Sequence, residues 1–373
     1  MRSLFPFLSL MSILLLRLLP AASPARPTPG AVLLDLDDAL YNSSSTTWRD
    51  FAKFLNLEKG SEVAGVCDLK RYFHRFGYLP PSDNFTDVFD SSLESALFDY
   101  QTNLGLPPTG KLDSDTIHLI MSPRCGMSDS HSHSHSHSRA AVGLHRTQHY
   151  AYFSGKPRWV RPMPVTLTYA FAPDHMIDYL SRDDIRAVFS RAFARWSKVI
   201  PVNFTETEDY PTADVKIGFY SGDHGDGEPF DGVLGVLAHA FSPENGRLHL
   251  DGAETWAVDF RTQRSKVAVD LESVATHEIG HVLGLAHSSN KDAIMYPSLS
   301  PRSKKVDLRV DDVEGVQALY GSNPDFKLSS FLEEEERETS GVADTNFRWW
   351  VPPIFLALVQ AIFALKVKRT FIL

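Results

Sequence analysis

Residues 276–297 constrain this chain most, because they hold three histidines and a glutamate at fixed spacing. The pattern is H-E-x-x-H-x-x-G-x-x-H, formed by His277, Glu278, His281, Gly284 and His287. On a helix, residues four apart project from one face, so His277 and His281 can share a metal ion. Gly284 can end the helix and bring His287 round as a third ligand. The spacing therefore predicts a zinc site with an open fourth position.

Two neighbouring features give this site a chemistry. Glu278 follows the first ligand, so it can act as a base on water held at the metal without being a ligand itself. Ile294-Met295-Tyr296 is predicted to form the floor beneath the zinc. The alternative is a helix whose histidines are solvated or packed in a core, but the third histidine, the glycine and the methionine together disfavour it.

Composition excludes several other classes of protein. The 373 residues leave room for two domains plus tails. A net charge of −9 argues against nucleic acid as a partner. Cys67 and Cys125 are the only cysteines, which excludes a disulfide-rich scaffold and a zinc site built on thiolate clusters.

The N-terminus predicts secretion. Residues 1–25 combine a basic start, an apolar run and small residues suited to cleavage, as in a signal peptide. A transmembrane anchor is the alternative, although the run is short. Three Asn-x-Ser/Thr sequons, at Asn42, Asn84 and Asn203, suit glycosylation of a secreted chain.

A small helical domain is predicted next, at about residues 60–122, after a flexible lead-in over 26–60. Apolar spacing and turn residues predict helices near 63–76, 91–103 and 113–121. Phe98-Asp-Tyr-Gln and Leu106-Pro-Pro-Thr-Gly-Lys-Leu-Asp resemble the peptidoglycan-binding-like prodomain of matrix metalloproteinases. Taken alone, that resemblance leaves open a module that binds cell walls or carbohydrate.

The segment Pro123-Arg-Cys-Gly-Met-Ser-Asp129 follows this domain. A thiolate here could bind zinc and fill the position that water needs. The segment resembles the cysteine switch of matrix metalloproteinases, which implies that Cys125 is the inhibitory zinc ligand and that Arg124 pairs with Asp129. A disulfide between Cys125 and Cys67 is the alternative; otherwise Cys67 is expected to be a buried free thiol.

The linker over residues 130–148 contains Ser-His four times in succession. It is predicted to be disordered and to join a propeptide, residues 26–148, to the following domain. Auxiliary metal binding by the histidines stays open.

A second domain is predicted over residues 149–321. Alternation predicts strands at 165–171 and 214–219, and amphipathic spacing predicts helices at 183–199 and 310–320. Tyr152-Phe-Ser-Gly-Lys-Pro-Arg-Trp159 resembles the start of a mature matrixin. The resemblance implies an α+β fold, the metzincin catalytic domain, with a twisted mixed five-stranded sheet and three helices.

A second metal-rich stretch covers residues 224–254. Its three histidines and one aspartate suit a closed zinc site, and its other carboxylates suit the oxygen shell of calcium. The resemblance to matrixins assigns structural zinc to His224, Asp226, His239 and His249. It assigns calcium to Asp231, Gly232, Leu234, Val236, Asp251 and Glu254, with Gly232, Leu234 and Val236 acting through backbone oxygens. Asp214 is a candidate for a further calcium site.

The C-terminal end predicts attachment to a membrane. An acidic linker over 322–345 precedes a hydrophobic segment, residues 346–373. Small residues upstream, with Ser340 and Gly341 as candidate lipidation sites, favour a GPI signal, as does a resemblance to plant matrix metalloproteinases without a hemopexin domain. The basic residues Lys366–Arg369 favour the alternative, a single membrane span.

These features predict a monomeric zinc- and calcium-dependent endopeptidase, made as a zymogen and displayed on the outer face of the plasma membrane. Its substrates would be proteins or peptides of the extracellular matrix or cell surface. Two other functions compete: a non-catalytic wall-binding module whose zinc is structural, and a metal-buffering protein built on the Ser-His tract. Hydrolysis of a peptide, with and without chelator, distinguishes the three.

Overall fold

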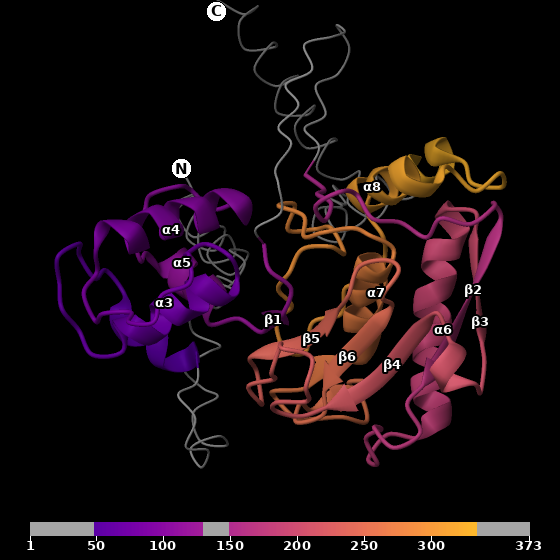
Figure 1. The fold of residues 1–373 in the computed structure, drawn as a ribbon, viewed down its shortest axis with the longest axis horizontal. Helices are drawn as coiled ribbons and strands as arrows, with labels where there is room; N and C mark the ends of the chain where they lie inside the picture. Colours follow the sequence, from indigo (N-terminus) through magenta and orange to yellow (C-terminus); the bar gives the residue numbers. More distant parts are fainter. Residues whose placement is uncertain (1–47, 130–148, 334–373) are drawn as a thin grey trace, which may run out of the picture.

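The computed structural model describes residues 48–129 and 149–333 (Figure 1). Several predicted features lie outside these residues: the signal peptide, Asn42, the Ser-His linker, the second half of the acidic linker, and the hydrophobic tail with Ser340 and Gly341. Within the described ranges, no helix combines the length and the apolar character that crossing a membrane requires.

Three helices form the N-terminal domain, as predicted: α3 (Val66–Arg75), α4 (Ser91–Asn103) and α5 (Ser114–Ile120). Asp90 and Asp113 start α4 and α5, because each side chain accepts a hydrogen bond from a backbone N–H of the first turn. The apolar faces of the helices share one core that includes Phe73 and Tyr100.

This core begins earlier in the chain than predicted. The 3-10 helix η2 (Trp48–Phe54) buries Phe51 and Phe54 in it, and the Trp48 ring packs edge-on against Tyr72 with centroids 5.0 Å apart. Residues 48–59 therefore belong to the domain and are not a flexible lead-in. The polar run before Trp48 concealed this short helix, which has too few turns to show a period.

The second domain is built on one mixed sheet. In chain order its strands are β2 (Val165–Phe171), β3 (Val202–Glu206), β4 (Val215–Tyr220), β5 (Val236–Ala240) and β6 (Arg247–Asp251). A sixth strand, β1 (Arg124–Cys125), comes from the N-terminal segment and pairs in parallel with β5 at the sheet edge (Figure 1). The order is β1-β5-β6-β4-β2-β3, and β5 with β6 is the one antiparallel pair of neighbours in this sheet.

Two helices pack together over this sheet: α6 (Arg182–Val199) and α7 (Leu271–Val282). Trp196 of α6 is fully buried, and its Nε1 donates to the Thr276 carbonyl at 2.9 Å. A short two-stranded sheet, β7 (Trp256–Ala257) with β8 (Val269–Asp270), leads into α7, and α8 (Val310–Tyr320) follows it. The predicted α+β class, five catalytic strands and three helices are confirmed.

Candidate active site and metal sites

Helix α7 places the first two histidines of the motif side by side. The Nε2 atoms of His277 and His281 lie 3.1 Å apart, and those of His281 and His287 lie 3.2 Å apart. The opposite nitrogens face acceptors: His277 Nδ1 lies 2.7 Å from the Ile294 carbonyl, and His281 Nδ1 lies 2.8 Å from the Leu285 carbonyl. Carbonyls only accept, so both rings carry their proton on Nδ1.

The backbone after α7 explains how the third histidine returns. Gly284 has φ of +103°, and a Cβ there would lie 2.2 Å from the Pro157 carbonyl oxygen. Only glycine fits a left-handed position so close to another backbone. The turn that follows brings Met295 under the site, where its sulfur would lie 2.2 Å from a Cβ added at Gly280.

This donor set fits zinc. Burial lowers the pKa of His277 well below its usual range and that of His287 to about 3, so both imidazoles are neutral. The unprotonated Nε2 atoms of His277 and His287 both lie within 3.2 Å of His281 Nε2, an arrangement that a shared cation stabilises. Neutral imidazoles in this number are the ligands of a zinc site with an open position.

Cys125 lies at the fourth position. Its Sγ is 3.3 Å from His281 Nε2, and the four ligand atoms together could hold one metal ion. Strand β1 fixes the thiol here, because Cys125 N donates to the Pro297 carbonyl and Gly126 N to the Ala238 carbonyl, both at 2.8 Å. Burial raises the pKa of the Cys125 thiol, whereas zinc binding favours the thiolate.

The Arg124–Asp129 pair is present as the resemblance implied. Arg124 Nη2 lies 2.6 Å from Asp129 Oδ1, and both side chains are almost fully buried. The guanidinium also stacks over the Phe76 ring at 3.8 Å. The disulfide alternative is wrong, since both cysteines are free, and Cys67 is half-buried rather than buried.

Glu278 is poised as a base. It is fully buried, and its carboxylate oxygens make no hydrogen bond of ordinary geometry within the described residues, although the Cys125 thiol lies close enough to interact with it. Burial raises the pKa of Glu278 to about 8. A nearby dication would favour its charged form, which can accept a proton.

A small cavity of about 20 Å³ lies beside this glutamate. Pro297, Ser298 and Leu299 line it, together with Lys305. Val282 of α7 does not line it, because its side chain is buried in the core.

The predicted structural zinc ligands also come together. Asp226 Oδ2 lies within 2.9 Å of three imidazole nitrogens, one each from His224, His239 and His249. Burial lowers the pKa of His239 and His249 to about 4, so these rings are neutral. One oxygen has too few lone pairs to bond well with three nitrogens, whereas a metal among the four would bind each of them. A closed set of this kind suits zinc.

Three carboxylates surround the loop before β5: those of Asp251 and Glu254 are buried, and Asp231 is exposed. Asp231, Asp251 and Glu254 accept hydrogen bonds from the amides of Val236, Gly232 and Leu234 at 2.7, 3.2 and 2.6 Å respectively. Burial, with repulsion between neighbouring carboxylates, raises the pKa of Asp251 to about 6 and that of Glu254 well above its usual range. The second oxygen of Glu254 is buried without a partner among the described residues. Clustered carboxylates with these properties suit calcium, while calcium binding by the three loop carbonyls stays a prediction.

Asp214 lies in a different environment. Its carboxylate is held by Arg161, whose Nη2 lies 2.5 Å away, and by the amide and hydroxyl of Thr168. A cation would have to compete with Arg161, so the calcium assignment of Asp214 stays a prediction without support from this geometry. Asn84 and Asn203 are both exposed, as glycosylation requires.

Sequence reasoning missed two supports of the site. Asp129 contacts the third histidine, at 2.6 Å between Oδ1 and His287 Nδ1. Asp312 accepts hydrogen bonds from the amides of Ile294 and Met295 at 2.9 and 3.0 Å, and thereby holds the turn beneath the metal. Both contacts join distant segments, and no local pattern in the sequence signals them.

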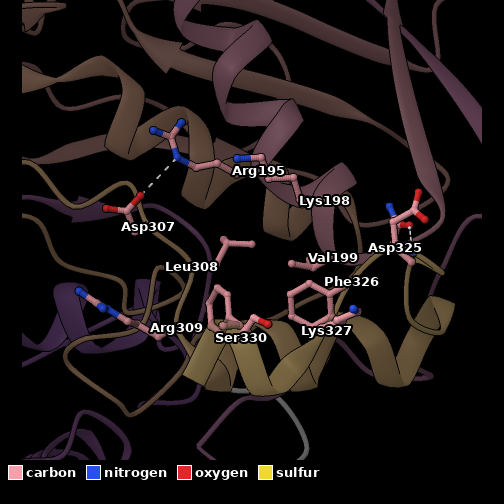
Figure 2. A pocket seen from close by; sticks show the side chains of 12 residues that line it. Arg195, Lys198, Val199, Asp307, Leu308, Arg309, Asp325, Phe326, Lys327 and Ser330 are labelled. Carbon is pink, nitrogen blue, oxygen red and sulfur yellow. Dashed lines mark hydrogen bonds and ion pairs between the residues drawn. The ribbon is translucent and has the colours of Figure 1, made fainter. Parts of the chain in front are cut away.

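A larger hollow of about 700 Å³ lies where the end of α6 meets residues 307–331 (Figure 2). Cationic side chains from Arg195, Lys198 and Lys327 surround an apolar floor that includes Leu308 and Phe326. None of the predicted site residues lines it.

Comparison with known proteins agrees with this geometry. The family model described as Matrixin matches residues 158–321, and that of a putative peptidoglycan binding domain matches residues 62–120. Metalloendoproteinase 1-MMP of Arabidopsis thaliana is 55% identical over 338 residues, which cover 90% of this chain and 91% of that protein. Metalloendoproteinase 4-MMP of the same plant is 61% identical over 275 residues, 74% of this chain and 78% of that protein. The interstitial collagenase of Oryctolagus cuniculus is 38% identical over 227 residues, 59% of this chain and 42% of that protein.

Proposed function

Because the chain belongs to the matrixin family of zinc metalloendopeptidases, we propose that it is made as a latent zymogen and cleaves extracellular matrix or cell-surface proteins. The observation that supports this most is the convergence of Cys125 Sγ and three histidine nitrogens beside the buried carboxylate of Glu278, which none of the described cationic side chains pairs with. A structural metal site needs no base. Zinc and calcium are the cofactors of the family, and the described residues provide donor sets for both.

The protein's own residues divide the reaction between them. His277, His281 and His287 would hold the catalytic zinc, which when bound supplies Lewis acidity toward a peptide carbonyl and water. Glu278 accepts a proton from the attacking water and then delivers it to the leaving amine. The small cavity lined by Leu299 and Lys305 is the candidate place for a substrate side chain once Cys125, which also lines it, has been withdrawn.

Latency follows from where the propeptide lies. Cys125 fills the fourth ligand position, and the pairing of β1 with β5 covers the sheet edge beside it. Cleavage in the linker 130–148 would release both. The structural zinc at His224, Asp226, His239 and His249 and the calcium loop at residues 231–254 then keep the catalytic domain folded.

The proposed location is the outer face of the plasma membrane. Residues 1–25 support export, matrixins are generally extracellular, and the tail after residue 345 supports a GPI anchor near Ser340 or Gly341. Detection of the terminal Phe-Ile-Leu in the mature protein by mass spectrometry would reject GPI processing and favour a single span.

Hydrolysis of a quenched peptide tests the proposed activity. The protein without residues 1–138 should cleave it, and a chelator should abolish cleavage. Glu278→Ala should remove turnover, by about 10²–10⁴-fold or more, while the protein still binds zinc. Substantial turnover by the purified mutant would reject the mechanism, and absence of turnover by the truncated protein with Glu278 intact would favour the wall-binding module.

A further inference from the structure

Asp129 connects the propeptide to the catalytic zinc site by a route separate from the thiol. Its Oδ1 accepts from Arg124 Nη2 and lies 2.6 Å from His287 Nδ1, while its Oδ2 accepts from the Tyr78 hydroxyl at 2.9 Å. The carboxylate is 5% exposed. Because a carboxylate only accepts, the imidazole must donate from Nδ1, which leaves the Nε2 lone pair of His287 directed at the metal position.

The three histidines differ in which part of the chain supplies the hydrogen-bond acceptor at Nδ1. His277 and His281 donate to carbonyls of Ile294 and Leu285, which belong to the catalytic domain. His287 donates to a propeptide side chain, and within the described residues Asp129 is its only hydrogen-bond acceptor at Nδ1. Loss of the propeptide therefore leaves His277 and His281 with their hydrogen-bond acceptors and removes the acceptor of His287.

We propose that Asp129 is a positioning residue for the catalytic zinc, holding His287 in its ligating tautomer and strengthening it as a ligand as long as the propeptide is bound. The inference rests on the proposed latent zymogen and adds a second link between propeptide and metal. A carboxylate that accepts the second N–H of a ligating histidine orients the ring and makes it a stronger donor, and removal of such a partner typically costs about 10–100-fold in metal affinity.

Activation then changes the metal site in two ways. The thiolate of Cys125 leaves the fourth position, and the carboxylate of Asp129 leaves His287. The precursor holds zinc more tightly than the mature enzyme, and part of that difference comes from Asp129 and not from sulfur. The propeptide thus helps the protein to bind and retain zinc, in addition to blocking the fourth ligand position.

Zinc affinity of the full chain tests this role. All variants carry Glu278→Ala, which prevents self-cleavage, and the dissociation constant for zinc is measured by competition with a chromogenic chelator. Asp129→Ala should weaken binding by about 10–100-fold, and Asp129→Asn by less, since its amide oxygen can still accept. The matched control is Arg124→Gln, which breaks the ion pair and leaves the contact with His287, and it should retain most of the affinity.

Equal losses in Asp129→Ala and Arg124→Gln would overturn the proposal, because Asp129 would then act only through the ion pair. Unchanged affinity in Asp129→Ala would overturn it too. If Asp129→Ala does not fold, as judged by circular dichroism, the isosteric Asp129→Asn variant decides. An Asp129→Asn variant that binds zinc as tightly as its Glu278→Ala parent would refute the role.

Nuclear magnetic resonance of histidine nitrogens gives a readout that a merely structural role would not change. In the zinc-loaded precursor the Nδ1–H proton of His287 should be strongly deshielded and slow to exchange. Arg124→Gln should keep this signal and Asp129→Ala should lose it; a signal retained in Asp129→Ala would refute the contact.

Repeating the affinity comparison in a Cys125→Ser background separates this proposal from the cysteine switch. The cost of Asp129→Ala should persist there, because the carboxylate does not act through sulfur, and its disappearance would contradict the proposal. Persistent latency of Cys125→Ser with Glu278 intact would reject the switch, and that result does not depend on the role of Asp129.

Discussion

Replacement of Glu272 by glutamine should destabilise the helix that carries the active site. Glu272 is 3% exposed in the first turn of α7, and its carboxylate contacts Arg191 at 2.9 Å, Arg195 at 2.7 Å and Lys304 at 3.1 Å. Burial opposes its ionisation, but hydrogen bonds from these three cations outweigh burial and lower the pKa of Glu272 to about 2. Glutamine has nearly the same shape and removes the charge that all three partners need.

The magnitude follows from that pKa. The gap between the usual 4.5 and about 2 corresponds to about 3 kcal/mol at neutral pH. Arg191 and Lys304 are about half exposed, so solvent screening reduces the contribution to about 2 kcal/mol. For a catalytic domain of this size, that loss lowers the melting temperature by about 4–8 °C.

The dependence on pH has a definite sign. A carboxylate whose folded pKa lies below its unfolded value stabilises the fold at pH above the unfolded value, and this contribution disappears as pH falls through the folded value. The wild-type protein should therefore lose the Glu272 contribution between about pH 4.5 and pH 2. In Glu272→Gln this part of the pH dependence should be absent.

Thermal unfolding followed by circular dichroism, at saturating zinc and calcium, measures both effects. Glu206→Gln is the matched control, because Glu206 pairs with Arg186 at 2.7 Å on the surface, with both side chains substantially exposed. That change should cost less than about 1 kcal/mol. Equal melting temperatures for wild type and Glu272→Gln, or equal losses in the two variants, would refute the reasoning.

Other changes should affect the metal centres and the core. Cys125→Ser should give a precursor that cleaves a quenched peptide without processing, because the fourth ligand position is free; continued latency would contradict the switch. His239→Ala should reduce bound zinc, measured by atomic emission, from two ions per chain to one, and two retained ions would contradict the second site. Gly280→Ala should destabilise the catalytic domain by about 1–3 kcal/mol, since its Cβ would overlap the Met295 sulfur; an unchanged melting temperature would show that Met295 moves aside at no cost.

Local signals explain why much of the fold was predictable. Helix α4 was expected at 91–103 and strand β2 at 165–171, and the structure has both at those residues. Each combines a clear hydrophobic period with an obvious start or stop. The three histidines of the motif were predictable as a group for the same reason, because helix geometry and one glycine suffice to bring them together.

Other parts depend on distant contacts. Strand β5 is buried along its whole length, so its sequence shows no alternation and predicts only a metal-binding loop. The contact between Asp129 and His287 spans 158 positions in the chain. The Asp312 side chain supports Met295, which lies 17 positions away in the chain. In the sequence, a carboxylate in the first turn of a helix is equally typical of a surface residue. Tertiary packing, and not local propensity, determines these features.

The pairing of β1 with β5 has a consequence for solubility. When the propeptide leaves, β5 becomes an edge strand with free backbone N–H and C=O groups, the kind of edge that templates association between chains. Phe230, Val236 and Tyr296 of the catalytic domain lose their cover at the same moment, since they pack in the propeptide core. In the proposed zymogen the propeptide would therefore protect the newly made protein from self-association, and the catalytic domain without it should associate more readily as its concentration rises.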